Sequence, residues 1–357
     1  MSTATLRPFA VLVGLVVGFA AACGSTSSST VPCTTANCAG CCDDAGRCQE
    51  GTTAQSCGRD GRTCSTCGFS QVCSAHQCIE GAGGGAGGTG GGAGGTLADG
   101  GLDDCSEAAK LVYVVDQNKT LSSFDPRKAG QASAFVDLGK LNCPAQTRAE
   151  PFSMSVDRSA TAWIIYDSGE LFTVNLRATP LDCVKTGFAP QQGVGKFGMG
   201  FVADAPGSSA ETLFISGSPL IGSLASTKFG TLATRPPYAI TLRGTLDGAP
   251  ELTGTGDAKL WGFFPDSLPP RVVQLDKATG AELPRALEAG PLAGFPLAWA
   301  FAFWGGDFWI FLERDSDPST NVWHLNAQTG QVTDVAPDTG RRIVGAGVST
   351  CAPVTIN

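Results

Sequence analysis

The stretch "RRIVGAGVSTC", residues 341–351, decides the fold of this chain. Its centre, from Ile343 to Ser349, alternates between two faces in the manner of a β-strand, with Gly345 and Gly347 on the same face. A single strand leaves its backbone N–H and C=O groups without partners. This strand must therefore pair with a segment that comes much earlier in the sequence.

Five stretches share one pattern in which the second and fourth residues are small and the alternate residues are mostly large. They are FSMSVD from Phe152, FGMGFVAD from Phe197, LTGTGD from Leu252, WAFAFWGGD from Trp299 and VGAGVS from Val344. Because side chains alternate along a strand, each stretch predicts a strand with one thin face and a mostly thick one. Such strands can stack in a ring, with the thick face of one against the thin face of the next.

Three more strand-like runs follow these starts and complete units of roughly fifty residues, a length typical of propeller blades. The second runs are TAWIIYDS, ETLFISGS, AKLWGFFPDS and DFWIFLERD, and the third runs include RVVQLDKATG and NVWHLNAQTG. The shared L-[DN]-x-x-T-G ending predicts a hairpin turn with glycine at a positive φ. Fourth runs such as AITLRG and QVTDVA close each unit.

The beginning of this region lacks a first strand. KLVYVVDQ, TLSSFDP and SAFVDLG are second, third and fourth runs that follow only CSEAA. The missing strand is the one at 343–349, an arrangement that resembles the closure of β-propellers. We therefore expect an all-β, five-bladed β-propeller over residues 105–357. Four or six blades are the alternatives, because the third unit can be divided in more than one way. The closure also predicts a disulfide between Cys105 and Cys351, which leaves Cys143 and Cys183 to join the first two blades.

The first 22 residues have the pattern of an export signal, with one arginine and an apolar run that ends in "AAAC" at Cys23. This ending resembles a bacterial lipobox, although Ala20 stands where leucine is usual. The resemblance implies that Cys23 is acylated and holds the chain to a lipid bilayer, with residues 23–32 as a flexible tether. An ordinary signal peptide is the alternative. By analogy with lipoprotein sorting, Gly24 favours the outer membrane.

Ten cysteines lie within residues 33–80, where few apolar residues could form a core. In an exported chain such a set predicts a disulfide-stapled module, and the adjacent Cys41 and Cys42 suit bridging. Zinc ligation is the alternative, because Cys64 and Cys67 have ligand spacing. The spacing does not give the connectivity. The ten are Cys33, Cys38, Cys41, Cys42, Cys48, Cys57, Cys64, Cys67, Cys73 and Cys78. Residues 81–104, rich in glycine, are expected to be a flexible linker.

Charge and composition exclude several function classes. The formal net charge is -8 and no basic patch occurs, which argues against nucleic acid or an anionic membrane surface as a partner. The chain has two histidines and neither a G-x-S-x-G nor an H-E-x-x-H motif. We therefore expect a monomeric protein without catalytic activity, cofactor or metal.

One face of the expected ring carries the candidate ligand residues, a ring of carboxylates that could bind a cation or a polyhydroxylated ligand. Propellers usually bind at the loops between second and third strands, where an aspartate recurs in four blades. The alternative is that each aspartate is only a turn residue. These are Asp116, Asp167, Asp266 and Asp315. A second recurring set follows the first strands on the opposite face and is expected to serve the turns there. Trp304 is the candidate exposed aromatic, whereas Trp299 is expected to pack between blades.

The whole plan of lipobox, cysteine-rich module, glycine-rich linker and propeller resembles envelope lipoproteins of myxobacteria. The resemblance implies display of a rigid ring from a membrane, where it binds a protein or glycan ligand. Two alternatives are an extracytoplasmic carbohydrate-active enzyme of the glycoside hydrolase type, which needs a pair of carboxylates at the ring mouth, and a structural envelope assembly factor.

Overall fold

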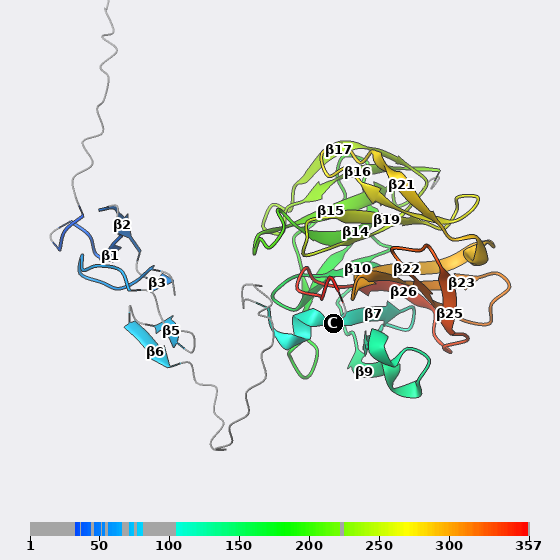
Figure 1. The fold of residues 1–357 in the computed structure, drawn as a ribbon, viewed down its shortest axis with the longest axis horizontal. Coiled ribbons are helices and arrows are strands. Elements are labelled where there is room, and N and C mark those ends of the chain that lie inside the picture. Colours follow the sequence, from blue (N-terminus) through cyan, green and yellow to red (C-terminus); the bar gives the residue numbers. More distant parts are fainter. Residues whose placement is uncertain are drawn as a thin grey trace, which may run out of the picture. The chain divides into compact units, whose positions relative to one another are not determined.

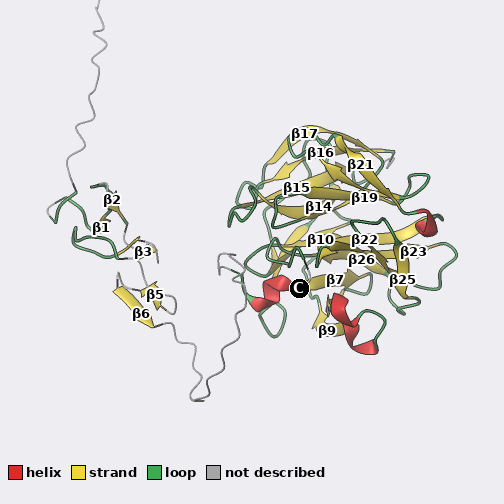
Figure 2. Ribbon diagram, in the orientation of Figure 1, coloured by secondary structure: helices red, strands yellow, loops and turns green. Residues whose placement is uncertain are grey.

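The chain divides into two compact units, Met1–Thr96 and Leu97–Asn357. A computed structural model describes residues 33–80, without 36, 44–45, 51, 54–55, 66–70 and 75–76, and residues 105–355, without 222–224 (Figures 1 and 2). The predicted signal peptide, Cys23, the tether, Cys67 and the linker at 81–104 lie outside these described residues. Within them, no helix has the length and apolar character that crossing a membrane requires.

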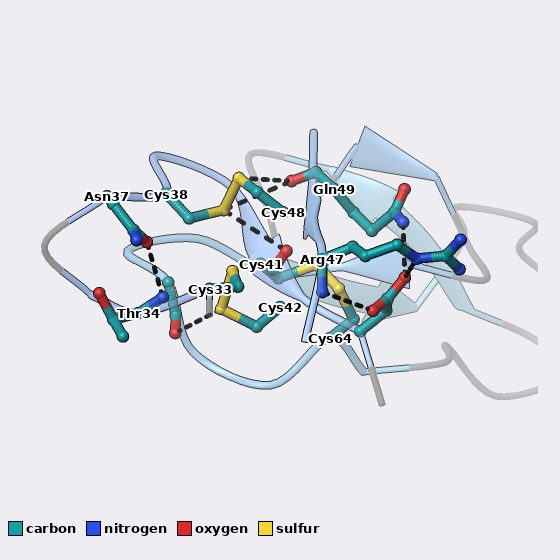
Figure 3. The surroundings of a disulfide bond; sticks show 12 residues. Cys33, Thr34, Asn37, Cys38, Cys41, Cys42, Arg47, Cys48, Gln49 and Cys64 are labelled. Atoms are coloured by element: carbon teal, nitrogen blue, oxygen red, sulfur yellow. Dashed lines mark hydrogen bonds and ion pairs between the residues drawn. A yellow bond between two sulfur atoms is a disulfide. The ribbon is translucent and has the colours of Figure 1, made fainter. Parts of the chain in front are cut away.

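The N-terminal unit is held by disulfides around three short hairpins. The hairpins pair β1 (Cys41–Cys42) with β2 (Cys48–Gln49), β3 (Thr52–Thr53) with β4 (Ser56–Cys57), and β5 (Gln71–Ser74) with β6 (Gln77–Glu80). Figure 3 shows the bridges Cys33–Cys42, Cys38–Cys48 and Cys41–Cys64. Cys57 and Cys78 are also disulfide-bonded. The predicted disulfide-rich module is confirmed.

The zinc alternative for this module is wrong as far as the described residues show. The sulfur of Cys64 is bonded to Cys41. The sulfurs of Cys33, Cys38 and Cys42 lie within 4.8 Å of one another, but each belongs to a disulfide. A sulfur in a disulfide is not the thiolate that zinc requires.

The C-terminal unit consists of five four-stranded antiparallel sheets. Blade 1 contains β26 (Ile343–Gly347), β7 (Val112–Asp116), β8 (Thr120–Phe124) and β9 (Phe135–Lys140). Blade 2 contains β10 (Pro151–Val156), β11 (Thr161–Tyr166), β12 (Leu171–Asn175) and β13 (Cys183–Lys185). Blade 3 contains β14 (Lys196–Ala203), β15 (Glu211–Ser218), β16 (Ser226–Leu232) and β17 (Ile240–Asp247).

Blade 4 contains β18 (Glu251–Gly254), β19 (Leu260–Phe264), β20 (Arg271–Leu275) and β21 (Glu282–Glu288), and blade 5 contains β22 (Pro296–Trp304), β23 (Asp307–Arg314), β24 (Asn321–Leu325) and β25 (Val332–Ala336). Short 3-10 helices occur at Glu107–Lys110, Pro126–Lys128, Ala132–Ala134 and Gly290–Leu292. The predicted five-bladed β-propeller is confirmed.

The C-terminal strand closes the ring. β26 pairs with β7, so that Gly347 lies opposite Tyr113 and Gly345 opposite Val115, and Figure 1 shows the two strands side by side. The structure also has the disulfide expected from this closure, Cys105–Cys351, with 5.6 Å between the Cα atoms. A second disulfide, Cys143–Cys183, joins the segment before β10 to β13.

Neighbouring blades pack through the thin faces of their inner strands. A Cβ at Gly345 would lie 2.9 Å from the Met154 nitrogen of blade 2, which explains why only glycine fits there. The inner strands are also edge strands, whose free amides need acceptors. The Ser155 hydroxyl accepts the Phe201 amide (3.1 Å), and the Thr253 hydroxyl accepts the Phe303 amide (3.1 Å). Small hydroxyl residues thus leave room for the next blade and satisfy its backbone.

The residues after β26, 350–355, form a plug across one end of the ring. Cys351 is bonded to Cys105 of blade 1, and the Thr350 hydroxyl contacts Arg158 of blade 2 and Glu211 of blade 3. In blade 4, Gly256 lies against the Thr350 carbonyl, and in blade 5 the Gly305 amide bonds to the Pro353 carbonyl (2.7 Å). The plug therefore contacts every blade at the end where the first strands finish.

Candidate functional site

The candidate site is a funnel at the end of the ring opposite the plug. The inner strands begin at this end, because β10, β18 and β26 all run from it toward the plug, and the turns between second and third strands lie on the same side. Their first residues surround an axial cavity of about 230 Å³. The polar groups and one indole that line the funnel are Gln117, Glu150, Asp167, Glu251, Trp299 and Arg342.

Glu251, the first residue of β18, is the most deeply placed charged group of the funnel. Its side chain is 3% exposed. Oε1 accepts hydrogen bonds from the Ser153 hydroxyl (2.6 Å) and the Met199 amide (3.1 Å), so this carboxyl bridges blades 2, 3 and 4. Burial raises the pKa of Glu251 to about 8, although these hydrogen bonds oppose the shift. Near neutral pH the funnel therefore holds a protonated carboxyl.

Arg342 lies just before β26 and brings a cation to the mouth. Its guanidinium binds the buried carboxylate of Glu313 through Nε (3.0 and 3.1 Å) and Nη2. The hydrogen bonds to Glu313 raise the pKa of Arg342 above its ordinary value. The Arg342 carbonyl also accepts the Gln117 amide (2.9 Å), which ties the start of β26 to the β7–β8 turn.

Asp167 and Glu150 form the blade 2 side of the mouth. The Glu150 amide donates to Asp167 Oδ1 (3.0 Å), and the Asp167 amide donates to the Glu150 carbonyl (3.0 Å). This reciprocal pair fixes the β11–β12 turn against the entry to β10. The second carboxylate oxygen of Asp167 makes no hydrogen bond within the described residues, and the side chain is exposed. The pair can accept hydrogen bonds from a hydroxylated or cationic ligand.

The four predicted aspartates do not form one ring of ligands. Asp167 lines the funnel, but Asp116 is 5% exposed and accepts the Thr120 amide (2.8 Å) within its own turn. Asp266 lines a separate cavity with Phe264 and Arg271, where burial raises its pKa. Asp315 is exposed at its turn. The turn interpretation therefore describes Asp116, and Asp167 is the one of the four that lines the funnel.

The prediction that Trp304 is an exposed aromatic is wrong. Trp304 is 6% exposed, and its Nε1 donates to the Lys110 carbonyl (2.8 Å) in the 3-10 helix of blade 1. The small-residue face of β22 turns toward blade 1, which covers the indole. Trp299 packs partly against the core between blades 4 and 5, as expected, while its remaining surface lines the funnel.

The aspartates of the opposite face fix turns there, Asp157 its own turn and Asp307 the β24–β25 turn. Asp157 Oδ1 accepts the Thr161 amide (3.0 Å), and Asp307 Oδ1 accepts the Ala327 amide (2.9 Å). Glu211 joins them from the start of β15 and binds the Arg158 amide (2.8 Å) and the Thr350 hydroxyl (2.8 Å). Burial raises the pKa of Glu211 to about 7. Of these groups, Glu211 is the one that holds the plug, through Thr350.

Sequence reasoning missed Glu150, Glu251 and Arg342. Glu150 and Arg342 immediately precede the inner strands β10 and β26, which start at residues 151 and 343, and Glu251 is the first residue of β18. Lys196 begins β14 in the same way, so a charged residue stands at that position in four blades. The repeat alignment contained this signal but did not use it, because the alignment began one residue later or more.

Comparison with known proteins gives similarity to propellers at low identity. No protein-family model matches the sequence, and no curated protein matches it. TolB from Acinetobacter baumannii shares 11% identity with a TM-score of 0.39, over 65% of this chain and 54% of TolB, so the chain spans about half of that protein's length.

Two further solved structures are similar at the same level. The Cps50 (Swd1) β-propeller domain from Myceliophteria thermophila shares 10% identity with a TM-score of 0.36, over 66% of this chain and 72% of that one. The GH43 β-1,3-galactosidase BT0265 shares 12% with a TM-score of 0.36, over 52% and 48%. The class of this protein, a five-bladed β-propeller behind a disulfide-rich module, follows from its own strand order and disulfides.

Proposed function

We propose that this chain is an envelope lipoprotein, anchored through Cys23, whose propeller binds a protein ligand at the funnel mouth as a monomer and without catalysis. The observation that carries the proposal is the blind funnel. The plug closes one end, while the open end presents ionisable groups and a partly exposed indole. Concave sites with a few converging polar groups are where propellers and other folds bind ligands.

A protein ligand is favoured over a glycan by the surroundings of the mouth. Ile221 and Leu268 are 93% and 92% exposed, and Phe295 is 67% exposed, in loops of the same face. Exposed apolar residues grouped around a site are typical of protein–protein contacts. By contrast, Trp299 is only partly available for stacking on a sugar ring.

Binding at the mouth can be tested with the full chain on a glycan array and against displayed random peptides. We expect peptide ligands whose binding is weakened by Asp167→Asn and unchanged by Asp182→Asn, which alters an exposed carboxylate beside β13. Glycan ligands with the same dependence on Asp167 would assign the mouth to sugars instead. Ligands indifferent to Asp167 would refute the site.

The anchor is tested separately by mass spectrometry of the mature protein. We expect an N-terminal Cys23 that carries acyl chains, which the disulfides of an extracytoplasmic chain accompany. Cleavage elsewhere, with an unmodified Cys23, would favour the ordinary signal peptide and would leave the funnel proposal in place.

A glycosidase is the second candidate, because a protonated Glu251 shares the funnel with Asp167 and Glu150. An acid with a raised pKa beside other carboxylates is the arrangement that such enzymes use. We favour binding because Glu251 Oε1 is engaged by Ser153 and Met199 at the wall between blades. Hydrolysis of aryl glycosides by the wild type but not by Glu251→Gln would establish the enzyme.

A further inference from the structure

Charges of both signs are interleaved around the mouth. Side chains that lie on this face without an ion pair among the described residues are the carboxylates Glu150 and Asp167 and the cations Lys119, Arg148 and Lys196. Lys196 Nζ lies 5.1 Å from the centre of the Phe152 ring, which lines the funnel. A ligand with a net charge therefore meets both attraction and repulsion at the mouth, and its charge contributes little to affinity.

The ionisable groups inside the funnel are also balanced. The Glu251 carboxyl accepts hydrogen bonds from the Ser153 hydroxyl and from the Met199 and Leu252 amides. Since burial raises the pKa of Glu251 to about 8, this carboxyl is mostly protonated and uncharged near neutral pH. The guanidinium of Arg342 is paired with the Glu313 carboxylate. Neither Glu251 nor Arg342 therefore brings an unbalanced charge to the funnel.

The remaining walls of the funnel are apolar. Phe152 of β10, Leu297 and Trp299 of β22 and Val344 of β26 line the cavity, and each keeps part of its surface exposed. Three blades thus supply apolar surface to one narrow space. Covering this surface with another apolar group removes it from water, which is favourable. The funnel is therefore suited to hold an apolar side chain.

Apolar side chains continue from the funnel onto the loops beside it. We call Leu220, Ile221, Leu268 and Phe295 the rim; they come from the loops of blades 3 to 5 on the mouth side, and each is at least 37% exposed. Leu220 lies against Gly169 in the Asp167 turn, and Phe295 precedes Leu297 of the funnel by two residues. The rim thus extends the apolar surface to one side of the mouth.

Two polar groups at the mouth suit the main chain of a peptide. The second carboxylate oxygen of Asp167 and the side-chain amide of Gln117 make no hydrogen bond within the described residues, and both residues line the funnel. A carboxylate accepts from a peptide N–H, and an amide can accept from an N–H and donate to a C=O. An extended segment that loses water at the mouth needs such partners for its backbone.

From these observations we infer that the funnel receives one large aliphatic or aromatic side chain from an extended, uncharged segment of a protein partner, whose neighbouring residues lie on the rim. The inference rests on the proposed function and names the chemistry of its ligand. A cavity of about 230 Å³ holds one side chain of the size of leucine or phenylalanine rather than a folded element. Side chains buried at the centre of an interface typically supply most of its binding energy.

The test titrates the full chain, in a calorimeter, with pools of short end-capped peptides that carry leucine, phenylalanine, glutamine, lysine or aspartate at a fixed central position and no other charge. We expect the leucine and phenylalanine pools to bind at least about tenfold more tightly than the other three. Raising sodium chloride from about 0.05 M to about 0.5 M should change this affinity by less than about twofold. The binding enthalpy should become more negative as temperature rises, because burial of apolar surface lowers the heat capacity.

Matched variants separate this surface from other exposed apolar residues. Leu297→Ser in the funnel and Leu268→Ser on the rim should each weaken the leucine and phenylalanine pools. Val136→Ser and Val184→Ser replace exposed valines on the outer strands β9 and β13 and should leave binding unchanged.

Three results would overturn the inference. The first is equal binding of all five pools, or tightest binding of the lysine or aspartate pool. The second is a dimer in light scattering that Leu268→Ser dissociates, because a second copy would then cover the rim. The third is Asp167-dependent binding of glycans alone, which would still leave a ligand site at the mouth. The absence of any Asp167-dependent ligand would remove the proposed function as well.

Discussion

Breaking the closure disulfide should cost more stability than breaking the second disulfide of the ring. Cys105–Cys351 spans 246 residues and Cys143–Cys183 spans 40. Loop-closure entropy then predicts losses of up to about 5.5 and about 3.9 kcal/mol for the two double cysteine-to-serine variants, because the longer loop restricts the unfolded chain more. Since domains are stable by about 5–15 kcal/mol, the first variant should be close to unfolding.

Urea titration followed by tryptophan fluorescence measures both free energies of unfolding. Native contacts alone do not predict this ranking. Without the closure disulfide, β26 still pairs with β7, and the Ser349 hydroxyl that follows β26 still donates to the Ala109 carbonyl (2.7 Å). Far-ultraviolet circular dichroism of both variants provides the control for an intact fold. If the Cys143–Cys183 variant loses as much stability as the Cys105–Cys351 variant, or more, the account of closure through the unfolded chain is refuted.

Three further predictions concern the thin faces, the buried carboxyl and the covered indole. Gly198→Ala places a Cβ 2.7 Å from the Pro250 carbonyl and should destabilise the protein by about 1–3 kcal/mol in thermal unfolding, whereas Gly290→Ala meets nothing within 4 Å and should change little. The pKa of Glu251 is raised in the folded state to about 8, so its contribution to stability is complete below about pH 4.5 and is lost as pH rises toward 8. Across this window the melting temperature of the wild type should fall relative to that of Glu251→Gln. If the two melting temperatures change with pH in parallel, Glu251 does not hold a buried proton. Trp304→Phe loses one hydrogen bond and should lower the free energy of unfolding, measured in urea, by about 1 kcal/mol without changing ligand binding. If this variant loses binding, the Trp304 indole belongs to the ligand site after all.

The fold could be predicted from the sequence because each inner strand must be thin on one face, and this requirement repeats in every blade. Small residues such as Gly345 and Ser155 recur at two positions in every inner strand, since neighbouring blades approach most closely there. The site could not be predicted in the same way. Glu251 begins β18 at the mouth, and its contacts with Ser153 and Met199 come from two other blades, so no pattern within β18 contains them.

The error at Trp304 has the same origin. Alternation along β22 placed it correctly on the small-residue face with Ala300 and Ala302, and all three belong to the core shared with blade 1. Whether that position is open depends on what the neighbouring blade brings over it. The 3-10 helix that ends at Lys110 covers it, and no local pattern in β22 contains that information.

The pairing of β26 with β7 also sets the order in which the ring can be completed. Blade 1 begins with β7, whose partner β26 lies more than two hundred residues later, so β7 keeps an open edge while the other four blades can each form from contiguous chain. Cys143 and Cys183 can meet as soon as blade 2 has formed, but Cys105 cannot form its disulfide until Cys351 is present. A chain emerging from a ribosome or a translocation channel therefore exposes the unpaired edge of β7 and an unpaired Cys105 until its last residues are available. Folding helpers that shield edges and exchange disulfides would act on this ring mainly during that interval.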